Sequence, residues 1–203
     1  MTQKSPVSER VPARERLLAA AEALFYEEGF NTVGIDRVIE RAGVAKASLY
    51  DCFGSKEELI RSYLAARHEA RRARITKGLE RFETPRERLL GMFDLLGEVI
   101  VDSNFRGCAF VKAGAESRPD SSVRGVCVDS RKWLRDLFAD LAKDAGAADP
   151  QALGQQLVML YDGATLSAQM DRNIDAAVQA RSVAAALLDV AVAASATKPK
   201  KKL

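Results

Sequence analysis

Apolar residues recur three and four positions apart along most of this sequence, which predicts amphipathic helices. The first three patterns cover residues 13–28, 35–42 and 46–53, and glycines follow the first two, as they commonly do at helix ends. The expected buried positions are Leu17, Ala21, Leu24, Phe25, Ile35, Val38, Ile39, Ala42, Leu49 and Phe53. Residues 1–11 are polar without periodicity, and we interpret them as a flexible arm.

Local start signals predict the longer helices that follow. Ser55 with Glu58, and Thr84 with Glu87, have the spacing of capping boxes, and Pro85 suits a first helical position. A short apolar helix is expected within residues 104–117, and further starts at Pro119-Asp120-Ser121, at Asp149-Pro150 and at a cap on Asn173. No strand-like alternation or internal repeat interrupts this pattern, so the predicted architecture is all-α.

Composition narrows the class of protein. The chain has 203 residues, enough for one or two domains with a full core. It has no N-terminal apolar run of a signal peptide, and the apolar stretch around Asp189 is too short to span a membrane. The three cysteines are therefore expected to be reduced thiols in a cytoplasmic protein. Residues 196–203 form a basic tail with four lysines.

Charge is distributed unevenly. Residues 1–81 hold 15 Lys/Arg and 12 Asp/Glu, a net charge of +3, whereas residues 82–195 hold 12 and 16, a net charge of −4. This asymmetry points to a polyanionic partner for the N-terminal part.

The two short helices at 35–42 and 46–53, joined at Gly43, have the spacing of a helix-turn-helix, whose second helix enters the DNA major groove. Small residues at Ala45, Ala47 and Ser48 would let that helix approach closely. Lys46, Ser48 and Tyr50 could then donate to phosphates and base edges. Lys56, one position after the Ser55 cap, is placed for another phosphate.

Residues 17–60 closely resemble the DNA-binding domain of TetR-family transcriptional regulators. The matching features are "ALF" and a glycine in the first helix, "AGV.K..LY..F" and "SKEEL", in this order and spacing. "RGCAFVKAGAE" also looks like a sixth-helix segment of one large subgroup. The resemblance implies a DNA-binding domain at 12–56 and a helical ligand-binding and dimerisation domain at 57–195.

This sequence departs from the family pattern at the helix caps. Gly34 and Ala45 stand where the family usually has Ser or Thr, and Asp51 stands where other residue types are common. Each lost cap removes a hydroxyl donor and weakens the start of a helix. We still expect the DNA contacts to come from Gly34, Arg37, Ala45, Lys46, Ala47, Ser48, Tyr50 and Lys56.

The resemblance implies a homodimer on a palindromic operator and a small apolar or amphipathic effector that releases the repressor from the DNA. Small residues at helical spacing suggest an interface on the last two helices, at Leu160, Ala164, Ser167, Ala168, Ala180, Ala184, Leu187 and Leu188. Candidate pocket residues are Phe93, Leu96, Phe110, Trp133, Phe138 and Met159, which could equally be core.

Other functions remain to be weighed. A constitutive DNA-binding protein would lack the pocket, and a redox-sensing regulator would use Cys108 or Cys127. An enzyme is not expected, because we find no nucleophile–base set, phosphate loop, metal-ligand cluster or cofactor motif. The single histidine, His68, is interpreted as a solvated side chain among arginines, or at most as one that lines the pocket.

Overall fold

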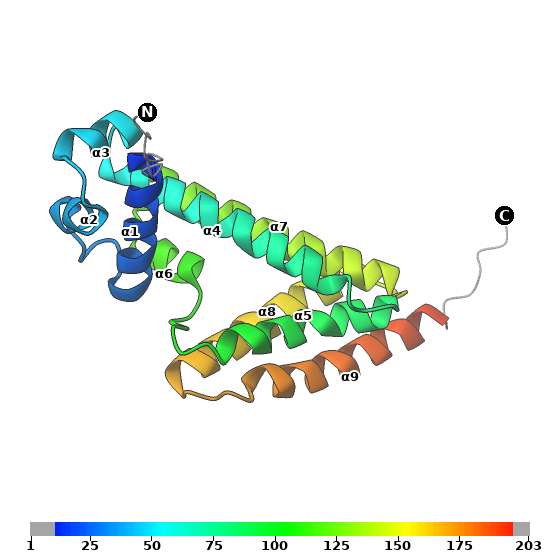
Figure 1. Ribbon diagram of the computed structural model, residues 1–203. Coiled ribbons are helices and arrows are strands. Elements are labelled where there is room, and N and C mark those ends of the chain that lie inside the picture. The colour runs from blue at the N-terminus through cyan, green and yellow to red at the C-terminus, as the bar shows by residue number, and fades with distance from the viewer. Residues whose placement is uncertain (1–10, 197–203) are drawn as a thin grey trace, which may run out of the picture.

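The computed structural model describes residues 11–196, and in that range the regular elements are all α-helices (Figure 1). Their bounds are α1 Ala13–Glu28, α2 Ile35–Ala42, α3 Lys46–Phe53, α4 Lys56–Leu79, α5 Pro85–Ile100, α6 Ala109–Glu116, α7 Ser122–Asp144, α8 Pro150–Met170 and α9 Ala176–Ala196. The all-α prediction is confirmed. The predicted arm and basic tail lie outside the described residues, apart from positions 11 and 196.

Helices α4, α5, α7 and α8 begin at side-chain caps. The Ser55 hydroxyl accepts from the Glu58 amide at 3.1 Å, and Thr84 and Glu87 form a full capping box at the start of α5. The Asp149 carboxylate accepts from the Ala152 amide at 3.0 Å. Each bond satisfies an amide that the first helical turn leaves without a partner.

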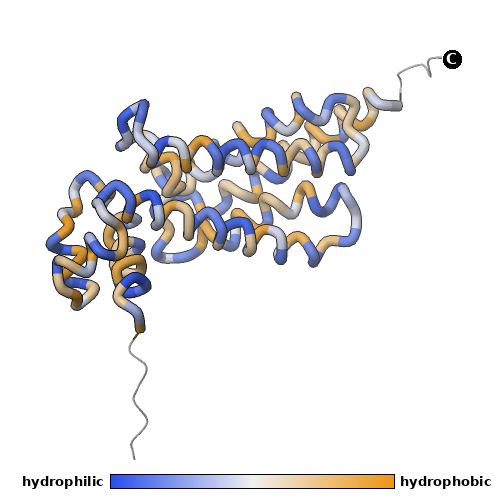
Figure 2. The backbone as a smooth tube through the Cα atoms, turned by 90° about the horizontal axis from the view of Figure 1, so that it is seen from above, coloured by the Kyte–Doolittle hydropathy of each residue, from blue (hydrophilic) through white to orange (hydrophobic). Residues whose placement is uncertain are grey.

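Two hydrophobic cores divide the molecule. The first holds α1, α2 and α3 against the N-terminal half of α4, and it also contains Phe110 and Ala113 of α6 and Val123 and Cys127 of α7. The second is built by α5, α8, α9 and the C-terminal half of α7. Figure 2 shows apolar and polar positions alternating along the helices, as amphipathic packing requires. Among the described residues, only those of α4 and α7 contribute side chains to both cores.

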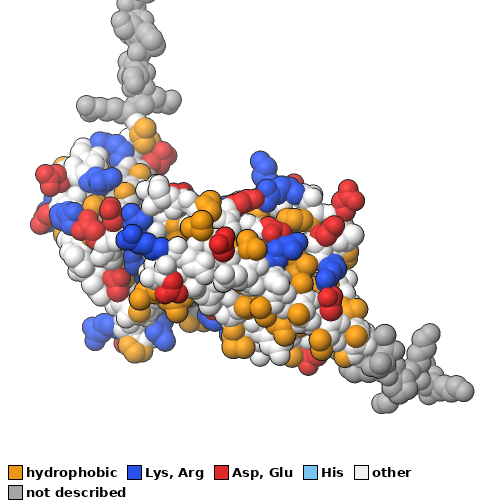
Figure 3. Space-filling model, turned by 90° about the horizontal axis from the view of Figure 1, so that it is seen from below, with side chains coloured by type: hydrophobic (Ala, Val, Ile, Leu, Met, Phe, Trp, Pro, Cys, Tyr) orange, Lys and Arg blue, Asp and Glu red, His pale blue; other side chains and the backbone are white. Residues whose placement is uncertain are grey.

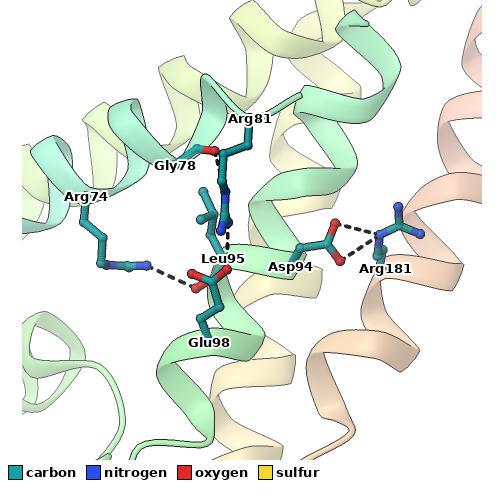
Figure 4. A network of polar contacts seen from close by, with 7 residues as sticks. All are labelled: Arg74, Gly78, Arg81, Asp94, Leu95, Glu98 and Arg181. Atoms are coloured by element: carbon teal, nitrogen blue, oxygen red, sulfur yellow. Dashed lines mark hydrogen bonds and ion pairs between the residues drawn. The ribbon is translucent and has the colours of Figure 1, made fainter. Parts of the chain in front are cut away.

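The long helices α4 and α7 run side by side from the first core to the far end of the molecule (Figure 1). Polar contacts then fix α5 to its neighbours, as Figure 4 shows. Arg81 pairs with Glu98 at 2.7 Å, Arg74 donates to the Leu95 carbonyl at 3.1 Å, and Arg181 of α9 pairs with Asp94 at 3.0 Å. The C-terminal end of α4 is thereby tied to α5, and α5 to α9.

The apolar stretch around Asp189 was expected to be too short for a membrane span, but the helix that contains it, α9, is long and apolar enough over Ala176–Ser195 by length and composition alone. One side of it packs on α5 and α8, through Ala177, Ala180, Ala184 and Leu188 of the second core. The ion pair of Arg181 with Asp94 lies at the edge of this packing. Its opposite side carries exposed valines, so α9 is a core helix with a second apolar face.

Candidate nucleic-acid interface and ligand cavity

The turn between α2 and α3 is held from both sides. Gly43 has φ +60°, a left-handed conformation that suits glycine, and the Val44 amide donates back to the Ile39 carbonyl at 3.3 Å. From α1, one guanidinium nitrogen of Arg16 donates to the carbonyls of Ala42 and Gly43, at 3.1 and 2.9 Å. The sequence did not single out Arg16 for this role.

Helix α3 buries one side and exposes the other. Leu49 and Phe53 lie in the first core, as predicted. Lys46, Ala47 and Tyr50 are exposed, Tyr50 by 45% of its surface, and Ser48 is half-buried. The uncovered side of α3 therefore carries two small residues, an ammonium group and a phenol, which is the surface that the sequence predicted for a recognition helix.

No side chain replaces the caps that the sequence predicted to be missing at the starts of α2 and α3. Gly34 and Ala45 are the residues before α2 and α3, both are exposed, and no side chain at either position accepts an amide hydrogen bond. Gly34 has open space around its Cα. The two positions leave the first amides of both helices uncovered by side chains.

The three cationic side chains predicted to contact DNA differ in how strongly other groups of the protein already hold them. Lys46 pairs with Asp36 at 3.1 Å, which raises the pKa of the ammonium, and both side chains are largely exposed. Arg37 is held by Glu28 through two hydrogen bonds of 2.6 and 2.9 Å, which lower the pKa of that carboxyl. Lys56 is half-buried, and burial lowers the pKa of its ammonium although Glu116 opposes the shift.

A cavity of about 800 Å³ lies among α4, α5, α6, α7 and α8, and its lining reaches Glu22 and Tyr26 of α1. Two predicted pocket residues, Leu96 and Phe110, line it. Further apolar lining comes from Val99, Phe105, Leu134 and Leu166. The volume suits a small organic molecule.

The other predicted pocket residues lie elsewhere. Phe93 and Phe138 are fully buried in the second core, with their ring centroids 5.9 Å apart, because large rings fill a core efficiently. Trp133 packs against that core outside the cavity lining, with its ring 5.5 Å from His68. Met159 is 64% exposed on the outer side of α8.

The predicted dimer residues also need correction. Ala164, Ala168, Ala180, Ala184 and Leu188 are buried inside one chain, where small side chains let α8, α9 and α5 approach closely. Leu160 and Leu187 are partly buried against the same core, and the Ser167 hydroxyl donates to Asp171 at 2.9 Å. The uncovered faces of α8 and α9 instead expose Met159, Met170, Val178, Val183 and Val190.

Chemically distinctive side chains gather around the cavity. Cys108 and Cys127 both line it, and burial raises the pKa of the Cys127 thiol to about 11. His68, expected to be solvated or to line the pocket, is half-buried and not among the lining residues: its ring lies 6.1 Å from that of Phe110 and 5.5 Å from that of Trp133, and burial lowers the pKa of its imidazole. Within residues 11–196, no three His, Cys, Asp or Glu side chains come close enough to hold a metal ion.

Several polar contacts join the first three helices to the rest of the molecule. The Asn31 amide and side chain donate to Glu116 at 3.0 Å each, and Ser122 donates to Glu57 from both its amide and its hydroxyl. The Tyr26 hydroxyl donates to the Gly107 carbonyl at 3.1 Å. The segment before α6 and the end of α6 thus contact α1 and the turn that follows it, and the start of α7 contacts the start of α4.

Gly107 itself is fixed by its surroundings. Its φ of +85° is a conformation that favours glycine, and a Cβ there would clash with the side-chain amide of Gln169 on α8. Helix α6 begins two residues later, at Ala109.

Comparison with known proteins shows which family has this sequence and architecture. Residues 17–63 match the model of bacterial regulatory proteins of the tetR family. The chain is 32% identical to the transcriptional regulator UidR of Escherichia coli over 142 residues, 68% of each chain. It is 29% identical to the E. coli transcriptional repressor NemR, over 80% of this chain and 86% of that protein.

Solved structures agree with the sequence relatives. SCO4454, a TetR-family transcriptional regulator from Streptomyces coelicolor, superposes with a TM-score of 0.84 at 31% identity, covering 89% of this chain and 96% of that one. E. coli NemR in its reduced form superposes with a TM-score of 0.74 at 26% identity, covering 85% and 95%. The helix-turn-helix, the helical domain behind it and these similarities over most of the chain lead to one assignment: this protein belongs to the TetR family, and it is a DNA-binding regulator of transcription, not an enzyme.

Proposed function

We propose that this protein is a cytoplasmic, dimeric repressor that a small molecule, bound in the cavity, releases from a palindromic operator. The observation that carries the proposal is the course of α4. Leu59, Ile60, Tyr63 and Leu64 anchor it in the core of the helix-turn-helix domain, and Arg67, Arg71 and Arg74 of the same helix line the cavity. A ligand in the cavity therefore touches the helix that carries the DNA-binding domain.

The DNA would meet the uncovered side of α3. Lys46 and Tyr50 would contact phosphates or base edges, Ser48 would contact a base edge, and Ala47 would allow close approach. Gly34 and Ala45 would bring helix starts near phosphates, and Arg37 would have to exchange Glu28 for DNA. Lys56, half-buried near Glu116, would act as a local positive charge at the start of α4.

Dimerisation would use the outer faces of α8 and α9. Figure 3 views the molecule from the α9 side and shows apolar side chains spread over this face. Met159, Met170, Val178, Val183 and Val190 are each at least 49% exposed in a single chain. A large exposed apolar face is typical of a permanent interface, and a two-fold axis through it would present two copies of α3 to one duplex.

Release would follow from a shift between two arrangements of the dimer. A ligand that binds more tightly when the two α3 helices are wrongly spaced shifts the population by its differential affinity, and a few kcal/mol suffice. The contacts of Asn31 with Glu116 and of Ser122 with Glu57 would transmit the shift beside α4. By linkage, operator DNA must weaken ligand binding by the same factor.

A thiol-sensing regulator is the second candidate, because Cys108 and Cys127 line the cavity together. The raised pKa of Cys127 keeps it protonated at neutral pH, so Cys108 would be the reacting thiol. Relevant here is that the NemR structure is described as a reduced form. If this candidate holds, peroxide releases the operator from the wild type and not from Cys108→Ser.

The main proposal is tested by selecting bound duplexes from a randomised DNA library, long enough for two half-sites about one helical turn apart. We expect inverted repeats to be enriched and two protomers to bind each duplex, as measured by sedimentation with labelled DNA. A Ser48→Ala, Tyr50→Ala variant, altered only on the exposed side of α3, should lose the enrichment. Enrichment of sites without two-fold symmetry, bound by one protomer, would contradict the dimer proposal.

A further inference from the structure

The cavity is cationic, although the body of the protein around it is acidic. Among its lining residues are six Lys or Arg and two Asp or Glu, a net charge of +4. Residues 82–195, which supply most of the walls, carry −4 overall. A positive lining in an acidic body is unlike a solvated helix face, where charges of both signs alternate.

Five of these six cations already have partners. Arg67 pairs with Glu22 at 3.1 Å and Arg131 with Asp162 at 2.6 Å. The other three donate to backbone carbonyls, namely Arg74 to Leu95 at 3.1 Å, Lys112 to Tyr26 at 2.8 Å and Arg124 to Gly114 at 3.3 Å. These groups are held in the wall by contacts that a ligand would have to break.

Arg71 is the exception. It is half-buried, and within residues 11–196 it makes neither a hydrogen bond nor an ion pair. Its guanidinium lies 5.8 Å from the ring centroid of Phe110 and 5.9 Å from those of Trp133 and Tyr161. Aromatic faces stabilise a cation and hold it in place, and they leave its N–H donors in the ring plane of the guanidinium unused.

The cavity wall offers a second unused polar group. Ser130 of α7 lines the cavity, its side chain is fully buried, and its hydroxyl has no hydrogen-bond partner in the described part of the chain. Buried hydroxyl groups normally have partners, because leaving one without costs free energy. Leu96, Val99 and Leu134 are among the apolar residues of the same lining.

We propose that the effector is an amphipathic organic anion. Its single acid group, a carboxylate or sulfonate, pairs with the guanidinium of Arg71, which can donate two parallel hydrogen bonds to such a group. Its aromatic or aliphatic body lies against the apolar wall, and a polar substituent on that body meets Ser130. This inference rests on the proposed function, because it takes the cavity as the effector site, and it specifies which chemical class binds there.

Two fluorescent probes of similar shape separate the contribution of the acid group to binding from that of the apolar body. Anilinonaphthalene sulfonate carries an acid group, and N-phenylnaphthylamine lacks it. Both are titrated into the full-length wild type and into Arg71→Met, Arg71→Lys and Arg72→Met. Arg72 is the matched control, since it lies on the same helix, pairs with Glu69 and does not line the cavity.

We expect saturable binding of both probes to the wild type. Arg71→Met should weaken the sulfonate about tenfold, the size of one charge-assisted hydrogen bond, and change the uncharged probe by no more than about twofold. Arg71→Lys should restore much of the sulfonate affinity, and Arg72→Met should change neither probe. Circular dichroism checks folding, and Arg71→Gln replaces Arg71→Met if the latter does not fold.

The outcomes separate this inference from the proposed function. Equal weakening of both probes, or no change in either, overturns the anion site, and the proposed function survives if the uncharged probe still releases operator DNA. Sulfonate binding that depends on Arg71 but leaves operator affinity unchanged supports the anion site and contradicts ligand-controlled release. If neither probe binds, both proposals fail.

Discussion

The outer side of α3 and the outer faces of α8 and α9 are all uncovered in a single chain, yet their chemistry differs. Helix α3 exposes Ala47 and Tyr50 beside an ammonium group, whereas α9 exposes Val178, Val183 and Val190. The surface of α3 suits a charged, hydrated partner that binds reversibly. The apolar surface of α8 and α9 suits a permanent protein partner. The comparison teaches that side-chain chemistry on the exposed side, and not helix amphipathicity as such, indicates the partner.

The largest effects are expected when a charge is placed on the buried side or on the exposed side of α9, which tests the proposed role of each side. Ala180 is buried, so Ala180→Glu should destabilise the fold by about 3 kcal/mol or more and lower Tm by about 10 °C. Val183 is 49% exposed, so Val183→Glu should keep the fold but yield monomers that no longer bind operator. Thermal unfolding and sedimentation velocity measure both effects.

The control for this pair is Val101→Glu, at an exposed valine that follows α5. It should leave both Tm and the dimer unchanged. A dimeric Val183→Glu would remove α9 from the interface, and a stable, folded Ala180→Glu would contradict the assignment of the small-residue stripe to the core.

On α3, the largest effect is expected from Tyr50. Tyr50→Ala should weaken operator binding about 10- to 100-fold, since a specific contact to DNA contributes roughly 1–3 kcal/mol. Tyr50→Phe separates the hydroxyl from the ring: if the hydroxyl contacts the DNA, both variants lose affinity alike. Fluorescence anisotropy with operator and with unrelated DNA measures the change, and an unaltered Tyr50→Ala would place the contact elsewhere.

Arg16 of α1 holds the turn that positions α3. Arg16→Met removes its hydrogen bonds to the carbonyls of Ala42 and Gly43 and should lower the free energy of unfolding by about 2 kcal/mol. Operator affinity should fall roughly tenfold, because the turn no longer fixes α3. Arg14→Met, which loses only an exposed contact with the Phe53 ring, is the control. Chemical denaturation with both variants provides the test.

The smallest effect is expected at the ion pair of Lys46 with Asp36. Lys46→Ala should weaken all DNA sequences alike by a few-fold and reduce the salt slope by about one. Asp36→Ala should act in the opposite direction, because Lys46 then meets DNA without losing a partner; exposed pairs contribute at most about 1 kcal/mol. Binding titrations at several salt concentrations measure both slopes, and parallel lines would exclude a phosphate contact.

The sequence predicted the helices well because their starts are local. Thr84, Pro85 and Glu87 specify the beginning of α5 without reference to any other part of the chain. The inward side of α3 was also predictable, since Leu49 and Phe53 are its only large apolar residues apart from Tyr50.

The partners of each helix face were less predictable. The alanines of α8 and α9 share one face at helical spacing, but spacing alone does not tell whether a neighbour belongs to the same chain or to another. Pocket residues were sought among aromatics, yet Phe93 and Phe138 fill the core. The available signal was the arginines of α4 at positions 67, 71 and 74, three and four residues apart on one face.

The continuous course of α4 has a consequence for how this protein can evolve. Substitutions in α5 and α8 can reshape the cavity for a new effector while the helix-turn-helix core stays as it is, because neither helix contributes to that core. Substitutions near Arg67 act on two traits at once, since it lines the cavity, pairs with Glu22 and lies 4.0 Å from the Tyr26 ring centroid in α1. Descendants of this protein should therefore diversify in effector preference through the residues of α5 and α8 that line the cavity, and keep those of α4.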